Sequence, residues 1–264
     1  MSPKNAKSEI EIAVKLEEPL TSGSCSKLAI ELIKYLLYQK QQVPFSYECL
    51  TQLQAKAKPT DKNFSSIKAV LNTLENVSEH LTLQLQREDC NIKEIVVVIG
   101  ATIVSPKFCV RVEISPKILS NRNHMDCQHS SRKPLVNLMK SMIACSEFQE
   151  AVASPLGPTN TFILLHKSDS NVISEFFLPK PQYAPPVRVP MSFRIKFQLS
   201  ESFKTSCNCM ALVKIYHESS REHVIERLTL QSKESLESDA YHSTMAPYQW
   251  YQSREIIKGF KFIR

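Results

Sequence analysis

Apolar residues follow a helical period through the first third of the chain. Over 24–42 they cover nearly the whole circumference of a helix, and Ser24 can cap its start. Pro44 ends this helix. Over 61–85, Ile67, Val70, Leu71 and Leu74 begin a series at the spacing of one helical face. We therefore predict two helices that pack side by side, the first of them buried on most sides.

The pattern then changes to short runs rich in β-branched residues. The run 95–99 is wholly apolar and ends at Gly100, while positions 108–114 alternate apolar and polar. This is typical of a buried strand followed by a half-exposed one. Further strand-like runs occupy 161–166, 187–199, 210–216, 223–230 and part of 248–262. The runs 210–216 and 223–230 are joined by a polar segment and predict a hairpin.

A third helix is predicted after the polar loop 116–133. Pro134 suits the first helical position, and the helix continues to about Val152. Helices early in the chain with strands clustered late indicate an α+β fold, in which the helices cover one face of a mostly antiparallel sheet. The mixed charges of 1–22 show little periodicity and predict a disordered tail, followed by a single domain over 23–264.

Composition excludes several classes of protein. The chain has 264 residues and is 42% hydrophobic, but its longest apolar run has only the five residues 95–99, so we expect no membrane span. We expect an intracellular protein, because no signal-peptide pattern begins the sequence. The four glycines lie too far apart for a phosphate-binding loop. The net charge is +7, but the basic residues are dispersed, so nucleic-acid binding is not expected.

Catalytic and metal chemistry find little support. Cys207, Cys209, His217 and His223 are suitable zinc ligands, but only one residue separates the two cysteines, which is too few for a structural zinc finger. Cys127 and His129 lack an orienting third group. We therefore expect no enzyme, metal or cofactor, although a pocket around these residues would favour an enzyme. Four Ser-Pro pairs, at Ser2, Ser105, Ser115 and Ser154, are either turn residues or phosphorylation sites.

The segment 31–44, Glu-Leu-Ile-Lys-Tyr-Leu-Leu-Tyr-Gln-Lys-Gln-Gln-Val-Pro, resembles the end of the first helix in the comet family of Mad-two-binding proteins. Other similarities keep the same order along the chain: Val97-Val98-Ile99-Gly100, Ser105-Pro106-Lys107, the helix around 138–148, Phe177-x-Pro179-Lys180, Tyr248-x-Trp250-Tyr251-Gln252 and Lys258-Gly259-Phe260. They span about 28–200 and 245–262. The segment 201–245, which contains the predicted hairpin, is longer than the family pattern and is interpreted as an insertion.

The resemblance implies a HORMA-like domain with three helices on a mostly antiparallel sheet, and an adaptor without catalytic activity. It implies binding to the closed conformer of the spindle-checkpoint protein Mad-two, with presentation to a hexameric AAA+ remodelling ATPase. The mitotic checkpoint complex is then dismantled and the checkpoint silenced. The implied location is the nucleus and cytoplasm, with the spindle or kinetochore in mitosis.

By the same resemblance, Gln39, Leu138, Met139, Met142 and Ile143 form the Mad-two contact. Pro179 and Lys180 face the ATPase. Tyr248, Trp250 and Phe260 pack against the protein's own sheet, which leaves no groove for a closure peptide. For Met139 a core position and for Gln39 an ordinary solvated face remain open. The alternative function is that of another HORMA protein, which binds a closure-motif peptide in checkpoint or meiotic chromosome-axis assembly.

Overall fold

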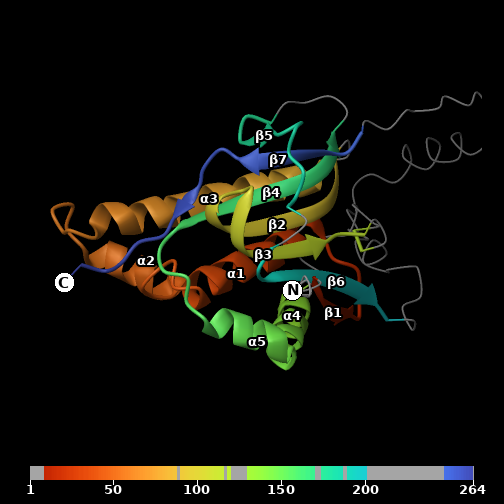
Figure 1. Ribbon diagram of the computed structural model, residues 1–264, viewed down its shortest axis with the longest axis horizontal. Helices are drawn as coiled ribbons and strands as arrows, with labels where there is room; N and C mark the ends of the chain where they lie inside the picture. The colour runs from red at the N-terminus through yellow and green to blue at the C-terminus, as the bar shows by residue number, and fades with distance from the viewer. Residues whose placement is uncertain are drawn as a thin grey trace, which may run out of the picture.

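A sheet of eight strands forms the centre of the structure, with helices on one of its faces (Figure 1). The computed structural model describes residues 9–87, 90–115, 118–119, 130–169, 174–186, 189–200 and 247–263. The strands are β1 Ile10–Leu16, β2 Cys90–Thr102, β3 Ser105–Glu113, β4 Asn160–Asp169, β5 Phe177–Pro179, β6 Ser192–Leu199, β7 Gln249–Ser253 and β8 Ile257–Lys258. The helices are α1 Ser22–Gln39, α2 Tyr47–Lys56, α3 Phe64–Gln86, α4 Arg132–Ala144 and α5 Ser146–Ala153.

The strand order is β1-β6-β3-β2-β4-β7-β5, with β8 also paired to β4. Only the pairs β1–β6 and β6–β3 are parallel, and the five other pairs are antiparallel. The predicted α+β class with a mostly antiparallel sheet is therefore confirmed, and the arrangement is consistent with a HORMA-like fold.

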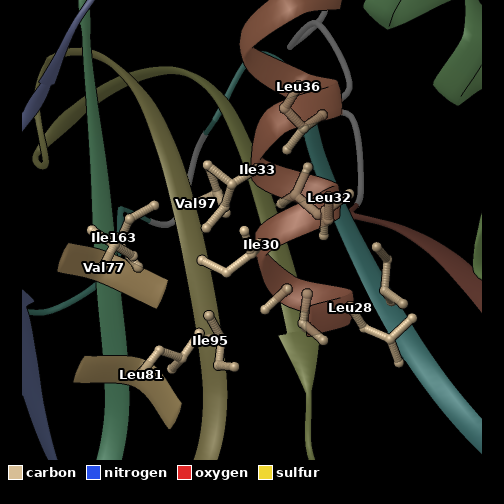
Figure 2. Packing of buried hydrophobic residues seen from close by; sticks show 14 of the residues in the cluster. Leu28, Ile30, Leu32, Ile33, Leu36, Val77, Leu81, Ile95, Val97 and Ile163 are labelled. Carbon is tan, nitrogen blue, oxygen red and sulfur yellow. The ribbon is translucent and has the colours of Figure 1, made fainter. Parts of the chain in front are cut away.

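Helix α1 lies against the sheet and supplies much of the core. Thr21 caps it by accepting a hydrogen bond from the backbone N–H of Ser24 at 3.0 Å. Its buried residues meet the inward-facing side chains of β2, such as Ile95 and Val97, as Figure 2 shows. Helix α3 packs beside α1, and a hydrogen bond of 2.7 Å joins the hydroxyls of Ser26 and Thr82 across their contact. The predicted pair of helices is confirmed.

Several sequence predictions are wrong in detail. Residues 10–16, predicted as part of a disordered tail, form strand β1, in which Ile12, Val14 and Leu16 are buried while the residues between them are exposed. This is the period of two that a half-buried strand requires. The predicted third helix is divided at Cys145, whose ψ of 104° is not helical, into α4 and α5. Helix α2, capped by Ser46, was not predicted.

Some predictions fall outside the described residues. They are the insertion 201–245 with its hairpin, the zinc candidates Cys207, Cys209, His217 and His223, and the pair Cys127 and His129.

Candidate functional site

Helix α4 has one buried and one exposed apolar face. Leu138 and Met142 are 1% and 0% exposed and belong to the core. Val136 and Ile143 are 41% and 64% exposed, and Met139 between them is half-buried. Spacings of three and four residues place these three side chains on the same side of the helix. We name Val136, Met139 and Ile143 the α4 stripe.

Of the residues implied for a Mad-two contact, Ile143 thus faces outward from α4 and Met139 is half-buried, packed in part against the core, whereas Leu138 and Met142 support them from inside. Val136 was not among the implied residues. Its spacing from Met139 and Ile143 is a signal that the sequence already contained.

The edge strand β1 holds α4 in place. The side-chain amide of Asn137 donates to the backbone carbonyl of Lys15 at 3.1 Å, and Lys133 approaches Glu17 at 3.3 Å. The carbonyl of Met142 accepts a hydrogen bond from Gln149 of α5 at 2.9 Å. The orientation of the α4 stripe therefore depends on β1, the strand that the sequence analysis missed.

Gln39 lies apart from the stripe, at the C-terminal end of α1. Helix α5 packs against this side of α1, where the rings of Tyr35 and Phe148 have centroids 6.5 Å apart. Gln39 is half-buried and Tyr38 is 46% exposed. Both line an open groove of about 840 Å³ at the end of α1. The other lining residues come from 41–44, 152–158 and 260–262.

Two buried polar residues that follow Gln39, Lys40 and Gln42, hold together the segments that line this groove. The ammonium group of Lys40 donates to the carbonyl oxygens of Ala151, at 2.7 Å, and of Ser154. Its side chain is 0% exposed, and burial lowers the pKa of Lys40 below its ordinary value of 10.5. Lys40 therefore ties the end of α1 to the end of α5.

Gln42, also 0% exposed, connects two further segments, the loop before β4 and the C-terminal segment. Its amide nitrogen donates to the carbonyl of Gly157 at 2.8 Å, and its side-chain oxygen accepts from the N–H of Thr159 at 2.8 Å. Its backbone carbonyl accepts from Phe260 at 2.9 Å. The run 39–42 thus contains two residues that line the groove, the half-buried Gln39 and the exposed Gln41, and two buried structural residues.

Pro179 and Lys180 lie at the other edge of the sheet. The backbone N–H of Lys180 donates to the carbonyl of Trp250 at 2.7 Å, which fixes the end of β5 against β7. Pro179 is exposed and has no N–H, so it limits strand addition at this edge. The Lys180 side chain is half-buried, close to the exposed Leu178.

The C-terminal aromatics divide between packed and exposed positions. The Trp250 ring stacks on His166 with centroids 4.5 Å apart, and Phe260 packs against the main core. Tyr248 differs from the expectation, since it is 42% exposed. It precedes β7, where the tilted ring of His166 lies 5.5 Å from its ring and the ammonium group of Lys93 lies 6.0 Å over it. Burial lowers the pKa of His166 below 6.5.

The two implied partner sites lie near opposite edges of the sheet. Helix α4 packs on β1, the first strand in the order, and Pro179 ends β5, the last (Figure 1). Five strands lie between β1 and β5 in this order, and β8 pairs with one of them, β4. A partner on the α4 stripe and another on the β5 edge can therefore be bound without competing for the same surface.

A family model described as "p31comet: Mad1 and Cdc20-bound-Mad2 binding" matches residues 3–201. The chain belongs to the p31comet family. The match covers β1 to β6 and hence the α4 stripe, Gln39 and the β5 edge. The resemblance noted from the sequence is thereby confirmed.

Two curated relatives are MAD2L1-binding proteins. The human protein is 25% identical over 190 residues and the mouse protein 24% identical over 190 residues. Each comparison covers 67% of this chain and 66% of the relative, so the chain matches just under two thirds of their length.

The described part of the chain offers little other chemistry. Within it, no three His, Cys, Asp or Glu side chains are grouped so that they could hold a metal ion. None of its helices is long and apolar enough to cross a membrane. The p31comet family is one of binding adaptors.

Proposed function

We propose that this protein is an adaptor that binds the closed conformer of Mad-two and presents it to a hexameric AAA+ remodelling ATPase. Its action promotes disassembly of the mitotic checkpoint complex and silences the checkpoint. The proposed location is the nucleus and cytoplasm, with spindle or kinetochore association in mitosis. The separation of the α4 stripe from the β5 edge is the observation that carries the proposal, because an adaptor needs two surfaces that can be occupied together.

The α4 stripe has the composition of a protein-binding centre. Val136 and Ile143 expose apolar surface that gains by leaving water, and the flexible thioether of Met139 fits an uneven partner surface. Lys133 and Lys140 are exposed on the same helix and provide a polar rim. Because Leu138 and Met142 hold the helix to the core, the stripe is presented on a rigid element.

Gln39 adds a second contact at the end of α1. Its amide can donate and accept hydrogen bonds at the margin of a groove whose walls include Leu156 and Phe262. The buried residues Lys40 and Gln42 fix the backbone on which it stands. A partner that reaches from the α4 stripe across α5 would meet Gln39.

On the ATPase side, Lys180 supplies a positive charge beside an edge strand that Pro179 keeps from pairing with other strands. A cation at such a place suits an acidic partner surface. The hydrogen bond from the backbone N–H of Lys180 to Trp250 fixes the point of the sheet from which this side chain extends.

The alternative, a HORMA protein that embraces a closure-motif peptide, has less support. Strand β7 pairs with both β4 and β5, and β8 pairs with β4. The protein's own C-terminal segment thus occupies the sheet positions at which an added peptide strand would pair.

The first experiment is a calorimetric titration of this protein with its cognate Mad-two, trapped separately in the closed and open conformers. We expect tight binding to the closed form only. The variants Met139→Ala and Gln39→Ala should each weaken binding by about 2 kcal/mol or more, roughly thirtyfold, if the replaced residue lies at the centre of the interface. Lys62→Ala, at an exposed position outside both sites, is the matched control. Absence of binding to either conformer would refute the proposal.

A second experiment tests presentation. Disassembly of a Mad-two complex by the ATPase should depend on this protein, and Lys180→Ala should slow it while leaving calorimetric binding to closed Mad-two unchanged. Lys62→Ala again serves as the charge-matched control. Equal disassembly rates for Lys180→Ala and wild type would remove Lys180 from the ATPase contact.

A further inference from the structure

Among the Ser-Pro serines that the structure describes, Ser105 and Ser154 are exposed, and of these two Ser154 lies outside the sheet. Ser154 and Pro155 are both exposed and follow α5 directly, outside any helix or strand. Ser105 instead starts β3 and pairs with Thr102, and Ser115 is half-buried. A kinase that requires proline after the acceptor serine would therefore meet Ser154 without opening the sheet.

We propose that Ser154 is a phosphorylation site for proline-directed protein kinases, and that phosphate there loosens the junction between α1 and α5. In the reaction the Ser154 hydroxyl oxygen bonds to the γ-phosphorus of ATP while the bond from that phosphorus to the bridging oxygen of ADP breaks. The hydroxyl proton passes to the kinase base. The products are phosphoserine and ADP.

The phosphate would arrive among unfavourable charges. It adds roughly −1.5 to −2 at neutral pH, at the C-terminal end of α5, where the helix dipole is already negative. Glu147 and Glu150 line the same cavity of about 370 Å³ as Ser154. Like charges in one cavity repel, so the segment after α5 is driven away from these carboxylates.

A buried cation, Lys40, is bonded to this segment, since its ammonium group binds the carbonyls of Ala151 and Ser154. The phosphate competes with these two neutral carbonyls for the ammonium group, because a charged acceptor attracts it more strongly than a carbonyl dipole does. If repulsion moves the segment instead, the same hydrogen bonds lengthen. Both responses disturb the link from α1 to α5.

That link shapes the groove beside Gln39. Residues 152–158 form one wall of the groove, and Gln39 and Tyr38 form part of another. Loosening the Lys40 link therefore displaces the wall opposite Gln39. The effect on Mad-two binding rests on the proposed function, whereas the modification and the loosening do not.

The test incubates the full chain with a recombinant cyclin-dependent kinase and ATP, beside Ser154→Ala and a synthetic peptide of residues 149–160. Mass spectrometry should find phosphate on Ser154 in both the chain and the peptide. Amide hydrogen exchange over 150–158 should become about tenfold faster in the treated wild type, because the local structure opens more often. It should stay unchanged in treated Ser154→Ala.

Two results would overturn the inference: no phosphate on Ser154 of the folded chain, whether or not the peptide is modified, or a phosphorylated chain with unaltered exchange over 150–158. Titration with closed Mad-two is a separate readout, and affinity should fall about tenfold on phosphorylation. If unmodified protein fails to bind Mad-two, the proposed function fails while hydrogen exchange still decides the role of Ser154.

Discussion

The ammonium nitrogen of Lys40 lies 2.7 Å from the carbonyl oxygen of Ala151, which joins the end of α1 to the end of α5 across 111 residues of sequence. The charge is fully buried and its partners are carbonyl dipoles. The face of the Phe108 ring lies 5.0 Å away and adds a favourable cation–π contact. Lys40 is therefore structural, although it stands beside the half-buried partner candidate Gln39.

Replacing Lys40 by methionine should destabilise the protein by about 2–4 kcal/mol, because two buried carbonyls lose their donor while the side-chain volume is nearly kept. Urea unfolding followed by circular dichroism measures the change. The control Lys27→Met, at an exposed position of α1, should alter stability by less than about 0.5 kcal/mol. Equal stability of Lys40→Met and wild type would show that the buried link contributes nothing.

The burial of Lys40 also predicts that the stability of the protein depends on pH. Burial lowers the pKa of Lys40 in the folded state below 10.5, so folding opposes its charged form. The penalty is complete below the folded pKa and disappears as the pH rises toward 10.5, since the folded state loses its proton first. The stability advantage of wild type over Lys40→Met should therefore grow on going from neutral pH to pH 10.5. Unfolding curves at several pH values test this, and a constant difference would contradict it.

Gln42→Leu should cost about 2–4 kcal/mol, because the N–H of Thr159 and the carbonyl of Gly157 lose their partner in a buried place. Gln39→Leu, three positions earlier and half-exposed, should be nearly neutral for stability. Thermal unfolding of the two variants measures the difference in their stability. If Gln39→Leu were the more damaging change, the assignment of the surface and structural glutamines would be reversed.

The two faces of α4 should respond differently to alanine. Leu138→Ala removes a fully buried side chain and should destabilise by about 2–5 kcal/mol. Ile143→Ala, at a position 64% exposed, should change stability by less than about 1 kcal/mol and instead reduce partner binding. Denaturation of both variants measures the loss of stability, and calorimetry with the partner measures the loss of binding. Loss of fold in Ile143→Ala would mean that the stripe belongs to the core.

Trp250 is the only tryptophan in the chain, and it stacks on His166 at 4.5 Å. A protonated imidazole should quench its fluorescence. Burial lowers the pKa of His166, an effect that outweighs the opposing influence of Glu94, and Lys93 and Arg111 lower it further. Quenching should therefore begin below pH 6.5, and stability should fall there too, because the unfolded state binds the proton more readily. His166→Phe should abolish the pH dependence of the tryptophan fluorescence. Quenching that survives this change would exclude His166 as its source.

The long helices and strands were predictable from the sequence because their apolar residues recur on the sides that are buried. The apolar residues of α1, α3 and β2 report directly which sides meet the core. Strand β1 was missed although Ile12, Val14 and Leu16 alternate with exposed residues, because neighbouring charges suggested a tail. Nothing local marks Ile10–Leu16 as the partner of β6, which lies about 180 residues later. Long-range pairing of this kind is decided by the whole sheet.

The candidate sites were predictable only in part. The family pattern supplied the segments, but it could not distinguish Met139 from Leu138, or Gln39 from Gln42, since that distinction depends on which side of the backbone the core lies. The groove at the end of α1 combines residues from 38–44, 152–158 and 260–262, which no spacing within one segment indicates.

The parallel pairing of β1 with β6 also sets the order of events during synthesis. Strand β1 is synthesised well before its only neighbour in the described sheet, β6, which is complete only at Leu199. At 5–20 residues per second, Ile12, Val14 and Leu16 wait roughly 10–40 s before they can be covered. For that interval the nascent chain carries an apolar strand suited to a chaperone, and the support of α4 is completed only once β6 has been made.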